Sequence, residues 1–464
     1  MSERDHSLPI EEISSFSSAE NNLTPEKGNF LTLSAPVTCQ WELTNSCSFG
    51  CKHCYNYWRS EDKTATTKID EDYLRTQKRA AEQIVRNNIF SVTLTGGEPL
   101  LVLEDIYPSL EILAKNEVAM SLNSNLALLD KKKVQMLKSL KIRSILTSLM
   151  SADEKTNNSL ANNSNAFRLT VEGIKTALDE GFWVAVNMVV SQENLEDIYQ
   201  TAEFVKSLGA TAFSATKASK PVNCKDFREL ALSVPNFRLM MQELLRVREN
   251  LGLDVDSLEA YPMCVYDTQS SRDLMGNRIC NAGKSSCTIG VDGQIRPCSH
   301  TTQQYGSIHK ENGLREAWLK LQPWRTMEFV PNECGDCRHI YWCRGGCRSE
   351  AYAYSGDLKA PDPYCDLTRP ALEKSPPEKI EVNPQGIFEF HKSLRTRDEE
   401  FGGIIYLTPV RWAAVTKTLL GFYEQKSENT FTLVELAGAL DVNATSVVAT
   451  AEHLIRKSIV SERR

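Results

Sequence analysis

The stretch "VTCQWELTNSCSFGCKHCYNYW", residues 37–58, joins an apolar run to a loop with cysteines at positions 47, 51 and 54. The run "VTCQWEL" has the composition of a β-strand, so the spacing C-x3-C-x2-C begins directly after a strand. A structural zinc site closes with four ligands, whereas this loop offers three thiols. The alternatives are zinc with a distant fourth ligand, such as His53, and an iron–sulfur cube that leaves one iron open.

Strand-like runs and helical stretches alternate from this loop to about residue 218. The runs that follow are "FSVTLTGGEP", "VAMSLNSN", "IRSILTSLM", "FWVAVNMVV" and "ATAFSATKA". Helices are predicted between them, over residues 70–86, 103–115, 131–140, 167–180 and 195–208. This alternation implies right-handed crossovers and a parallel sheet, either open or closed into a partial barrel. In both arrangements the residues that follow the strands meet at one rim, where ligands bind.

The cysteine loop and a second motif together resemble the radical SAM superfamily. The second motif, "LTGGEP" at residues 94–99, follows the second strand. Its glycines allow a close backbone approach, and Glu98 can accept a hydrogen bond from an ammonium group. The form "CSFGCKHCY" is similar to that of the peptide- and protein-modifying members. The resemblance implies a [4Fe–4S] cluster on Cys47, Cys51 and Cys54, whose open iron chelates S-adenosylmethionine and cleaves it to a 5′-deoxyadenosyl radical.

The same resemblance implies further contacts with S-adenosylmethionine at strand ends. "LNSN" (residues 122–125) stands where the family often has Thr-Asn-Gly, and "TSLMS" stands where many members show Ser-Leu-Asp. The alternative for each is an ordinary polar residue at a strand end. Relatives often carry an arginine soon after the fourth strand, but here Arg168 comes late for that role. The predicted cofactor-binding residues are Gly96, Gly97, Glu98, Pro99, Ser124, Asn125 and Ser148.

One further polar residue, Asn187, lies in the middle of the strand-like run "VAVNMVV". Its side chain is expected either to face the interior of the barrel or to be a core amide whose hydrogen bonds are satisfied.

Cysteines gather again further along the chain, which has 14 in all. Clustered cysteines in a large intracellular chain indicate metal rather than disulfides. The spacings are C-x12-G-x4-C over 280–298, C-x2-C-x5-C-x3-C over 334–347, and then Cys365. This pattern resembles the SPASM extension of radical SAM enzymes. A zinc ribbon is the alternative for the middle four cysteines only.

The SPASM resemblance implies two auxiliary [4Fe–4S] clusters, three clusters in total. The first is expected on Cys280, Cys287, Cys298 and Cys347, and the second on Cys334, Cys337, Cys343 and Cys365. With four protein ligands each, neither would have an open iron, which favours electron transfer. Cys39, Cys224 and Cys264 are expected to be ordinary buried thiols.

The last 80 or so residues form a third region. "IFEFHKSLRTRD" and "FGGIIYLT" are predicted strands, and "RWAAVTKTLLGFYEQ", "TLVELAGAL" and "ATSVVATAEHLIRKSIV" are predicted helices. The last two helices resemble a helix-turn-helix in a small winged-helix fold. DNA binding is one interpretation, although neither helix has a dense basic face. The other is the peptide-binding domain of peptide-modifying enzymes, where a leader peptide adds as a strand to a sheet edge.

The predicted fold is α/β, a partial (β/α)6 barrel followed by a cysteine-rich iron–sulfur domain and a small winged-helix-like domain. The predicted boundaries are a disordered tail over 1–33, the barrel over 34–225, a connecting helical segment over 226–279, the SPASM domain over 280–370, and a linker with the last domain over 371–464.

The composition excludes several classes. The formal net charge of −7 argues against a general nucleic-acid partner. No apolar run reaches the roughly 18 residues of a membrane span. The polar, acidic N-terminus has no signal-peptide core, so a cytoplasmic protein is expected.

The predicted function is a radical enzyme that takes a hydrogen from a ribosomally made peptide carrying a leader. It then installs a cross-link, an epimerisation or a backbone rearrangement, with flavodoxin or ferredoxin as electron donor. The alternatives are a SPASM oxidoreductase acting on a small molecule, a porphyrin or a protein side chain, and an iron–sulfur DNA-binding regulator. Sulfatase maturases have an Asp directly after the G-x4-C cysteine, where this chain has Ser299.

Overall fold

The computed structural model describes residues 31–58, 66–276, 278–373, 375, 380–426 and 428–463. The chain divides into two compact units. The large unit is Ala35–Lys374, and the small unit combines Met1–Ser34 with Ser375–Arg464. Most of the predicted N-terminal tail, and residues 376–379 of the predicted linker, lie outside the described residues. The parallel sheet and the cysteine-rich region both belong to the large unit.

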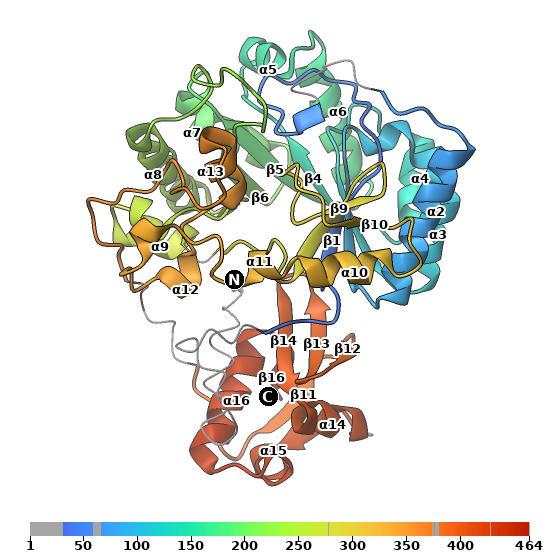
Figure 1. Ribbon diagram of the computed structural model, residues 1–464, viewed down its shortest axis with the longest axis vertical. Coiled ribbons are helices and arrows are strands. Elements are labelled where there is room, and N and C mark those ends of the chain that lie inside the picture. Colours follow the sequence, from blue (N-terminus) through green and yellow to red (C-terminus); the bar gives the residue numbers. More distant parts are fainter. Residues whose placement is uncertain are drawn as a thin grey trace. The chain divides into compact units, whose positions relative to one another are not determined.

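The large unit is an α/β fold built on one sheet with the strand order β10-β9-β8-β1-β2-β3-β4-β5-β6-β7 (Figure 1). Neighbours from β1 to β7 are parallel, as is the pair β1 and β8, whereas β9 and β10 run antiparallel to their neighbours. The strands are β1 Thr38–Glu42, β2 Ser91–Thr95, β3 Ala119–Asn123, β4 Ser144–Ser148, β5 Trp183–Val190, β6 Ala212–Lys217, β7 Asp254–Asp256, β8 Ser286–Ile289, β9 Gln294–Arg296 and β10 Gly306–Ser307.

Helices connect the parallel strands. In Figure 1, α2, α3 and α4 lie beside one part of the sheet, and α7 and α8 lie beside the other. The helices are α2 Glu71–Arg86, α3 Leu103–Lys115, α4 Lys131–Ser139, α5 Glu154–Ala161, α6 Ala166–Asp179, α7 Ile198–Ser207, α8 Val234–Leu251, α9 Gln269–Met275, α10 Gly313–Lys320, α11 Gln322–Arg325, α12 Ile340–Cys343 and α13 Arg348–Ser355. Short 3₁₀ turns are η3 Pro99–Leu101, η4 Leu195–Asp197, η5 Met263–Val265 and η6 Asn332–Cys334.

Capping side chains explain why several of these helices begin where they do. Asp70, Asp130 and Asp153 accept hydrogen bonds from the backbone N–H three residues later, at the starts of α2, α4 and α5. The sequence reading found α2, α3, α4, α6 and α7 but missed the short helix α5. Its segment "EKTNNSLA" is polar, so its apolar periodicity is weak.

Strands β8 and β9 form an antiparallel hairpin whose turn contains Asp292-Gly293, with Gly293 in the left-handed region at φ +76°. The hairpin does not stand apart from the barrel strands. Strand β8 pairs in parallel with β1, so that Cys39 lies opposite Cys287. The cysteine-rich region thereby extends the same sheet, which a sequence reading cannot see because the two strands are about 250 residues apart.

The described part of the small unit has two three-stranded sheets and three helices. The sheet orders are β15-β11-β16 and β12-β13-β14. Its elements are β11 Ile387–Phe390, β12 Arg395–Glu399, β13 Gly402–Thr408, β14 Arg411–Thr416, α14 Lys417–Gln425, β15 Thr430–Thr432, α15 Leu433–Leu440, α16 Ala444–Arg456 and β16 Val460–Glu462. Buried Phe388, Phe390, Phe431, Leu436 and Leu454 belong to its core.

One helix prediction in the small unit was wrong at its start. "RWAAVT" forms β14, antiparallel to β13, and α14 begins only at Lys417. The apolar residues of this segment are compatible with either a strand or a helix. Pairing with β13 makes the segment a strand. Helices α15 and α16 meet at 109°, within the range of a helix-turn-helix. Across the described ranges, no single helix is long and apolar enough to cross a membrane, and α15 with α16 reaches that length and apolarity only as a bent pair.

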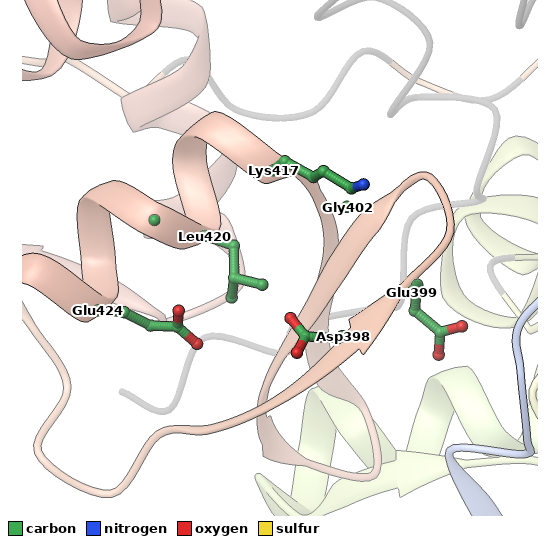
Figure 2. Close-up of a pocket in the computed structure, with 7 residues that line it drawn as sticks. Asp398, Glu399, Gly402, Lys417, Leu420 and Glu424 are labelled. Atoms are coloured by element: carbon green, nitrogen blue, oxygen red, sulfur yellow. The ribbon is translucent and has the colours of Figure 1, made fainter.

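A pocket of about 360 Å³ opens in the small unit between α14 and the turn from β12 to β13. Asp398 and Glu424 contribute carboxylates to its lining, and Lys417 contributes an ammonium group. Glu399 also lines the pocket, but its carboxylate pairs with Arg397 at 2.8 Å. Figure 2 shows the carboxylates of Asp398 and Glu424 directed toward one another. The lining is therefore acidic on balance.

A buried ion pair joins the first strand to the hairpin. Glu42 ends β1 and pairs with Arg296 of β9, and the two residues are 2% and 1% exposed. A second amino group of Arg296 donates to the Thr301 carbonyl at 3.0 Å. Because both charges are out of water, each depends on its partner.

Arg296→Met is expected to lower the free energy of unfolding by about 3–5 kcal/mol, because it leaves the Glu42 carboxyl group buried without its cation. The double variant Glu42→Leu/Arg296→Met is expected to recover much of that loss. Urea unfolding followed by far-UV circular dichroism measures both. Arg168→Ala is the control because the Arg168–Glu172 pair is 56% and 59% exposed; its effect is expected within about 0.5 kcal/mol. A similar loss for Arg296→Met and Arg168→Ala would contradict this account.

Candidate active site at the strand ends

The loop that carries Cys47, Cys51 and Cys54 leaves the end of β1 and is held along its length by backbone hydrogen bonds. The N–H of Gly50 donates to the Ala161 carbonyl at 3.1 Å, and the N–H of Lys52 donates to Leu160 at 2.9 Å. Both acceptors lie at the end of α5, the helix that the sequence reading missed. All three cysteines are partly exposed.

The glycine motif after β2 packs its backbone against the start of the cysteine loop. A Cβ atom added to Gly97 would lie 2.0 Å from the Ser46 carbonyl oxygen, and one added to Gly96 would lie 2.6 Å from that of Thr44. In return, the N–H of Gly97 donates to Thr44 at 2.6 Å and the N–H of Glu98 donates to Ser46 at 2.8 Å. The two loops therefore form one rigid backbone structure that only glycine permits.

Glu98 ties this structure to the next strand. Its side chain is 1% exposed and accepts hydrogen bonds from the Leu100 N–H at 3.0 Å, the Ser124 hydroxyl at 2.7 Å and the Asn125 N–H at 2.9 Å. Burial raises the pKa of Glu98, and these three bonds oppose that shift. Pro99 follows at the first position of η3 and is buried. The carboxylate thus crosslinks the ends of β2 and β3.

Asn125 reaches from the end of β3 to the cysteine loop. Its side-chain amide donates to the Ser48 hydroxyl at 3.0 Å and contacts the Cys47 sulfur at 4.0 Å. The Ser124 hydroxyl, which donates to Glu98, also accepts from the Leu126 N–H at 2.9 Å. Asn125 therefore connects the end of β3 to the first part of the cysteine loop.

Polar residues of β4, β5 and β6 lie beside one another further along the sheet. Ser148 is the last residue of β4 and lies opposite Asn187 of β5. Asn187 is 6% exposed, and its side-chain oxygen accepts from the Thr216 hydroxyl at 2.9 Å. These contacts fit the interpretation of Asn187 as a core amide. Arg168 lies on α6 and pairs with Glu172 on the exposed helix face, at 3.1 Å.

The donor set of the first loop suits the cluster that the sequence implies. Three thiols from one short loop are the ligands of a cube with one open iron, and the sheet rim beside them is polar. Among the described residues, no three His, Cys, Asp or Glu side chains are already placed for a single metal ion. The thiolate ligands of a [4Fe–4S] cube lie farther apart than the ligands of a single zinc ion. The finding therefore argues against a mononuclear zinc site and says nothing against a cube.

Three of the four cysteines predicted for the first auxiliary cluster come together. Burial raises the pKa of Cys298 to about 11 and that of Cys347 well above its usual value, and the charge of Cys280 adds to both shifts. Cys287, the fourth, is 1% exposed on β8, opposite Cys39. Its assignment to this cluster stays a prediction.

The second auxiliary group also converges, with one addition. The thiol of Cys334 is hydrogen-bonded to that of Cys365. Cys264, expected to be an ordinary buried thiol, is hydrogen-bonded to Cys365 as well. The Met263 N–H donates to the Cys343 sulfur at 3.3 Å. Sequence spacing does not reveal Cys264, which lies 70 residues before Cys334.

A buried charged network lies between the first loop and Cys347. Lys217, at the end of β6, is 2% exposed and pairs with Glu259 at 3.1 Å and Glu350 at 3.2 Å. Although burial lowers the pKa of Lys217, the two carboxylates raise it more, so the ammonium ion persists. The His300 ring, 4.0 Å from Glu259, stacks on Tyr55, the residue after Cys54. Lone residues of these types carry no sequence signal, so the sequence reading missed the network.

Comparison with known proteins agrees with this geometry. Residues 41–205 match the Radical SAM superfamily. The AdoMet-dependent heme synthase of Methanosarcina barkeri is 25% identical over 359 residues, which cover 71% of this chain and 96% of that protein. Mycofactocin maturase MftC of Mycolicibacterium smegmatis is 24% identical over 364 residues, or 76% of this chain and 88% of that protein.

A solved structure shares the fold. Streptococcus suis SuiB bound to precursor peptide SuiA superposes with a TM-score of 0.57 at 17% identity, covering 74% of this chain and 77% of that chain. The chain is therefore similar to the Radical SAM superfamily over residues 41–205, and its fold, with the central parallel sheet, is similar to that of SuiB.

Gly97→Ala is expected to slow S-adenosylmethionine cleavage roughly 100-fold, because the added methyl group displaces the Ser46 carbonyl and the cysteine loop with it. The measurement is 5′-deoxyadenosine formed per minute by the anaerobically reconstituted enzyme. Gly438→Ala on α15 is the matched control, since a Cβ there meets nothing within 4 Å, and its rate is expected to be unchanged. Equal rates for both variants would show that the contact between the two loops does not matter.

Proposed function

We propose that this protein is a radical S-adenosylmethionine enzyme that modifies a ribosomally made peptide. The observation that carries the proposal is the three-thiol loop at the end of β1, fixed by the glycine motif at the end of β2. A cluster on Cys47, Cys51 and Cys54 with S-adenosylmethionine bound would supply a 5′-deoxyadenosyl radical, which removes hydrogen from a substrate carbon. The expected outcome is a cross-link, an epimerisation or a backbone rearrangement.

The chain's own residues bind and orient the reactants in this proposal. Gly96, Gly97 and Pro99 shape the backbone against which the methionine end of the cofactor rests. Glu98 keeps lone pairs beyond its three intramolecular hydrogen bonds, so it can still face an ammonium group. Ser124, Asn125 and Ser148 supply polar groups from the ends of β3 and β4. The rings of Tyr55 and His300 stack with their centroids 4.0 Å apart and cover the side of the proposed site toward the hairpin.

Two auxiliary clusters complete the proposed cofactor set. The convergence of Cys280, Cys298 and Cys347, and that of Cys334, Cys343 and Cys365, supports one cluster at each place. Cys287 and Cys337 are the remaining proposed ligands. The high pKa values of the buried thiols mean that the chain alone keeps them protonated, and cluster assembly would have to displace those protons. Reduction would need an external donor such as flavodoxin or ferredoxin.

A peptide substrate is supported by two relatives. MftC is named a maturase, and SuiB was solved with a precursor peptide bound. In the small unit, β12 and β14 are the outer strands of their sheet, so each offers an edge to which a leader peptide can add. The acidic pocket beside β12 favours a leader with basic side chains (Figure 2). Helix α16 carries Arg456 paired with Glu452, a poor surface for DNA phosphates.

Porphyrin chemistry is the second candidate because the heme synthase of Methanosarcina barkeri is 25% identical. However, 71% of this chain already covers 96% of that enzyme, so more than a quarter of the chain lies beyond the match. A leader-binding unit accounts for such an addition, whereas a porphyrin enzyme gives it no role.

Replacing Cys47, Cys51 and Cys54 together with Ala is expected to abolish 5′-deoxyadenosine formation and to leave roughly eight of twelve iron atoms per chain. The loop thiols hold only the first cluster in this account, so the auxiliary clusters remain. Chromatography and iron analysis after anaerobic reconstitution provide the two readouts. Continued cleavage of S-adenosylmethionine by this variant would refute the assignment of the loop.

The protein is co-expressed with a short precursor peptide encoded nearby. A cross-link is expected to lower the mass of that peptide by about two hydrogen atoms. An epimerisation is expected to leave the mass unchanged in ordinary water and to incorporate deuterium in heavy water. Tandem mass spectrometry locates the change. Conversion of a porphyrin precursor by the purified enzyme, with no change in the peptide, would favour the second candidate instead.

A further inference from the structure

We propose that Arg325 is the counter-ion of the first auxiliary cluster and that its guanidinium group favours the reduced form of that cluster. The inference rests on the proposed function, because it presupposes a cluster on Cys280, Cys287, Cys298 and Cys347. Arg325 acts through the cluster rather than on the substrate, so it is a positioning residue. It ends α11, and the cysteine spacing does not indicate it.

The Arg325 side chain is buried without a carboxylate. The residue is 2% exposed, and among the described residues no Asp or Glu pairs with it. Its Nε donates to the Gly283 carbonyl at 2.8 Å, and one amino group donates to the Trp318 carbonyl at 2.5 Å. The other amino group, Nη1, is buried and has no hydrogen-bond partner in the described part of the chain. A buried cation with an unused N–H donor requires an anion nearby.

Other buried arginines of this protein have such an anion in the protein itself. Arg296 pairs with Glu42, and Arg397 pairs with Glu399 at 2.8 Å. Arg325 lies instead over an indole ring, with its guanidinium carbon 4.4 Å from the ring centroid. The ring attracts the cation but carries no net charge, so the positive charge of Arg325 stays unbalanced.

The contacts of Arg325 place its charge beside the cysteines of the first group. Gly283, which accepts from the Arg325 Nε, lies in the turn between Cys280 and Cys287. A Cβ atom on Gly283 would lie 2.6 Å from the Cβ atom of Trp324. The segment that carries Arg325 therefore packs directly against the turn that joins two of the proposed ligands.

The charges of Arg325 and Cys287 act on one another. Burial raises the pKa of the Cys287 thiol to about 12, although the Arg325 cation opposes that shift. Burial lowers the pKa of Arg325 to about 10, with the charge of Cys287 opposing it, so the guanidinium group stays charged at neutral pH. A cluster with four thiolates is anionic, and reduction by one electron from an external donor adds one more negative charge. The fixed cation beside Cys287 offsets that added charge.

A similar arrangement occurs beside the second group of cysteines. Arg348 is 6% exposed and donates to the carbonyls of Leu358 at 2.9 Å and Ala360 at 2.7 Å. The hydrogen bond with Cys365 lowers the pKa of Cys334 most, and the charge of Arg348 lowers it further. Each proposed auxiliary cluster therefore has beside it a buried guanidinium group that backbone carbonyls hold in place.

The test is a redox titration followed by electron paramagnetic resonance, in the full chain with Cys47, Cys51 and Cys54 replaced by Ala so that only auxiliary clusters contribute. The first auxiliary cluster is identified as the signal that Cys280→Ala removes. Arg325→Gln keeps a hydrogen-bond donor and removes the charge. At the potential where half of that cluster is reduced in the background protein, this variant is expected to lower the ratio of reduced to oxidised cluster about tenfold, a shift of about 59 mV for one electron.

Two further variants separate charge from shape. Arg325→Lys keeps the positive charge, so its ratio is expected to lie closer to that of the background protein than to that of Arg325→Gln. Arg315→Gln is the matched control, because Arg315 is exposed on α10 and solvent screens its charge. Its ratio is expected to be unchanged.

An unchanged or higher ratio in Arg325→Gln at full iron content would overturn the proposal. So would an equal fall in Arg325→Gln and Arg325→Lys, because a role in shape alone is lost in both. If Arg325→Gln retains only roughly four of eight auxiliary iron atoms, recovery of the iron in Arg325→Lys supports the role of the charge, and loss in both variants contradicts it. Failure of the proposed function looks different, since the background protein would then bind no auxiliary iron and give no signal to titrate.

Discussion

The backbone contact between the loops after β1 and β2 is the constraint on which the rest of the site depends. Gly97 can lie against the Ser46 carbonyl only because it has no Cβ, and the two hydrogen bonds from Gly97 and Glu98 use that closeness. Strands β1 and β2 pair in parallel, which fixes the distance between their ends. The sheet therefore determines the position of the cysteine loop. Glu98 extends the constraint to β3 through Ser124 and Asn125.

Burial affects the charge of the cysteines proposed as auxiliary-cluster ligands. The auxiliary thiols Cys298 and Cys347 lie in a medium that disfavours their charged forms, and Lys217, Glu259 and Glu350 are buried near them. Charges in such a place are stable only as a balanced set. The ammonium group between two carboxylates provides that balance in the protein itself. The protonated thiols are neutral, so they carry no charge to balance until a proposed cluster forms.

The sequence predicts local features well and long-range ones poorly. The cysteine loop, the glycine motif and most barrel helices follow from spacing and periodicity within short windows, and the hairpin turn at Gly293 follows from its dipeptide. The pairing of β8 with β1 joins segments about 250 residues apart, and no local pattern encodes it. The same holds for Cys264, whose thiol meets Cys365 about 100 residues later, and for Lys217 between its two carboxylates. The apolar pattern of residues 411–416 predicts a helix, but pairing with β13 makes this segment the strand β14.

The account's central claim is that the three-thiol loop leaves one iron open and that S-adenosylmethionine occupies it. The most direct measurement is electron–nuclear double resonance on the reduced cluster in the presence of S-adenosylmethionine labelled with ¹⁵N at the amino group and ¹⁷O in the carboxylate. The account predicts hyperfine coupling to both labels, which is lost in the variant without Cys47, Cys51 and Cys54. A reduced first cluster that shows no coupling to either label, while S-adenosylmethionine is bound, would contradict it.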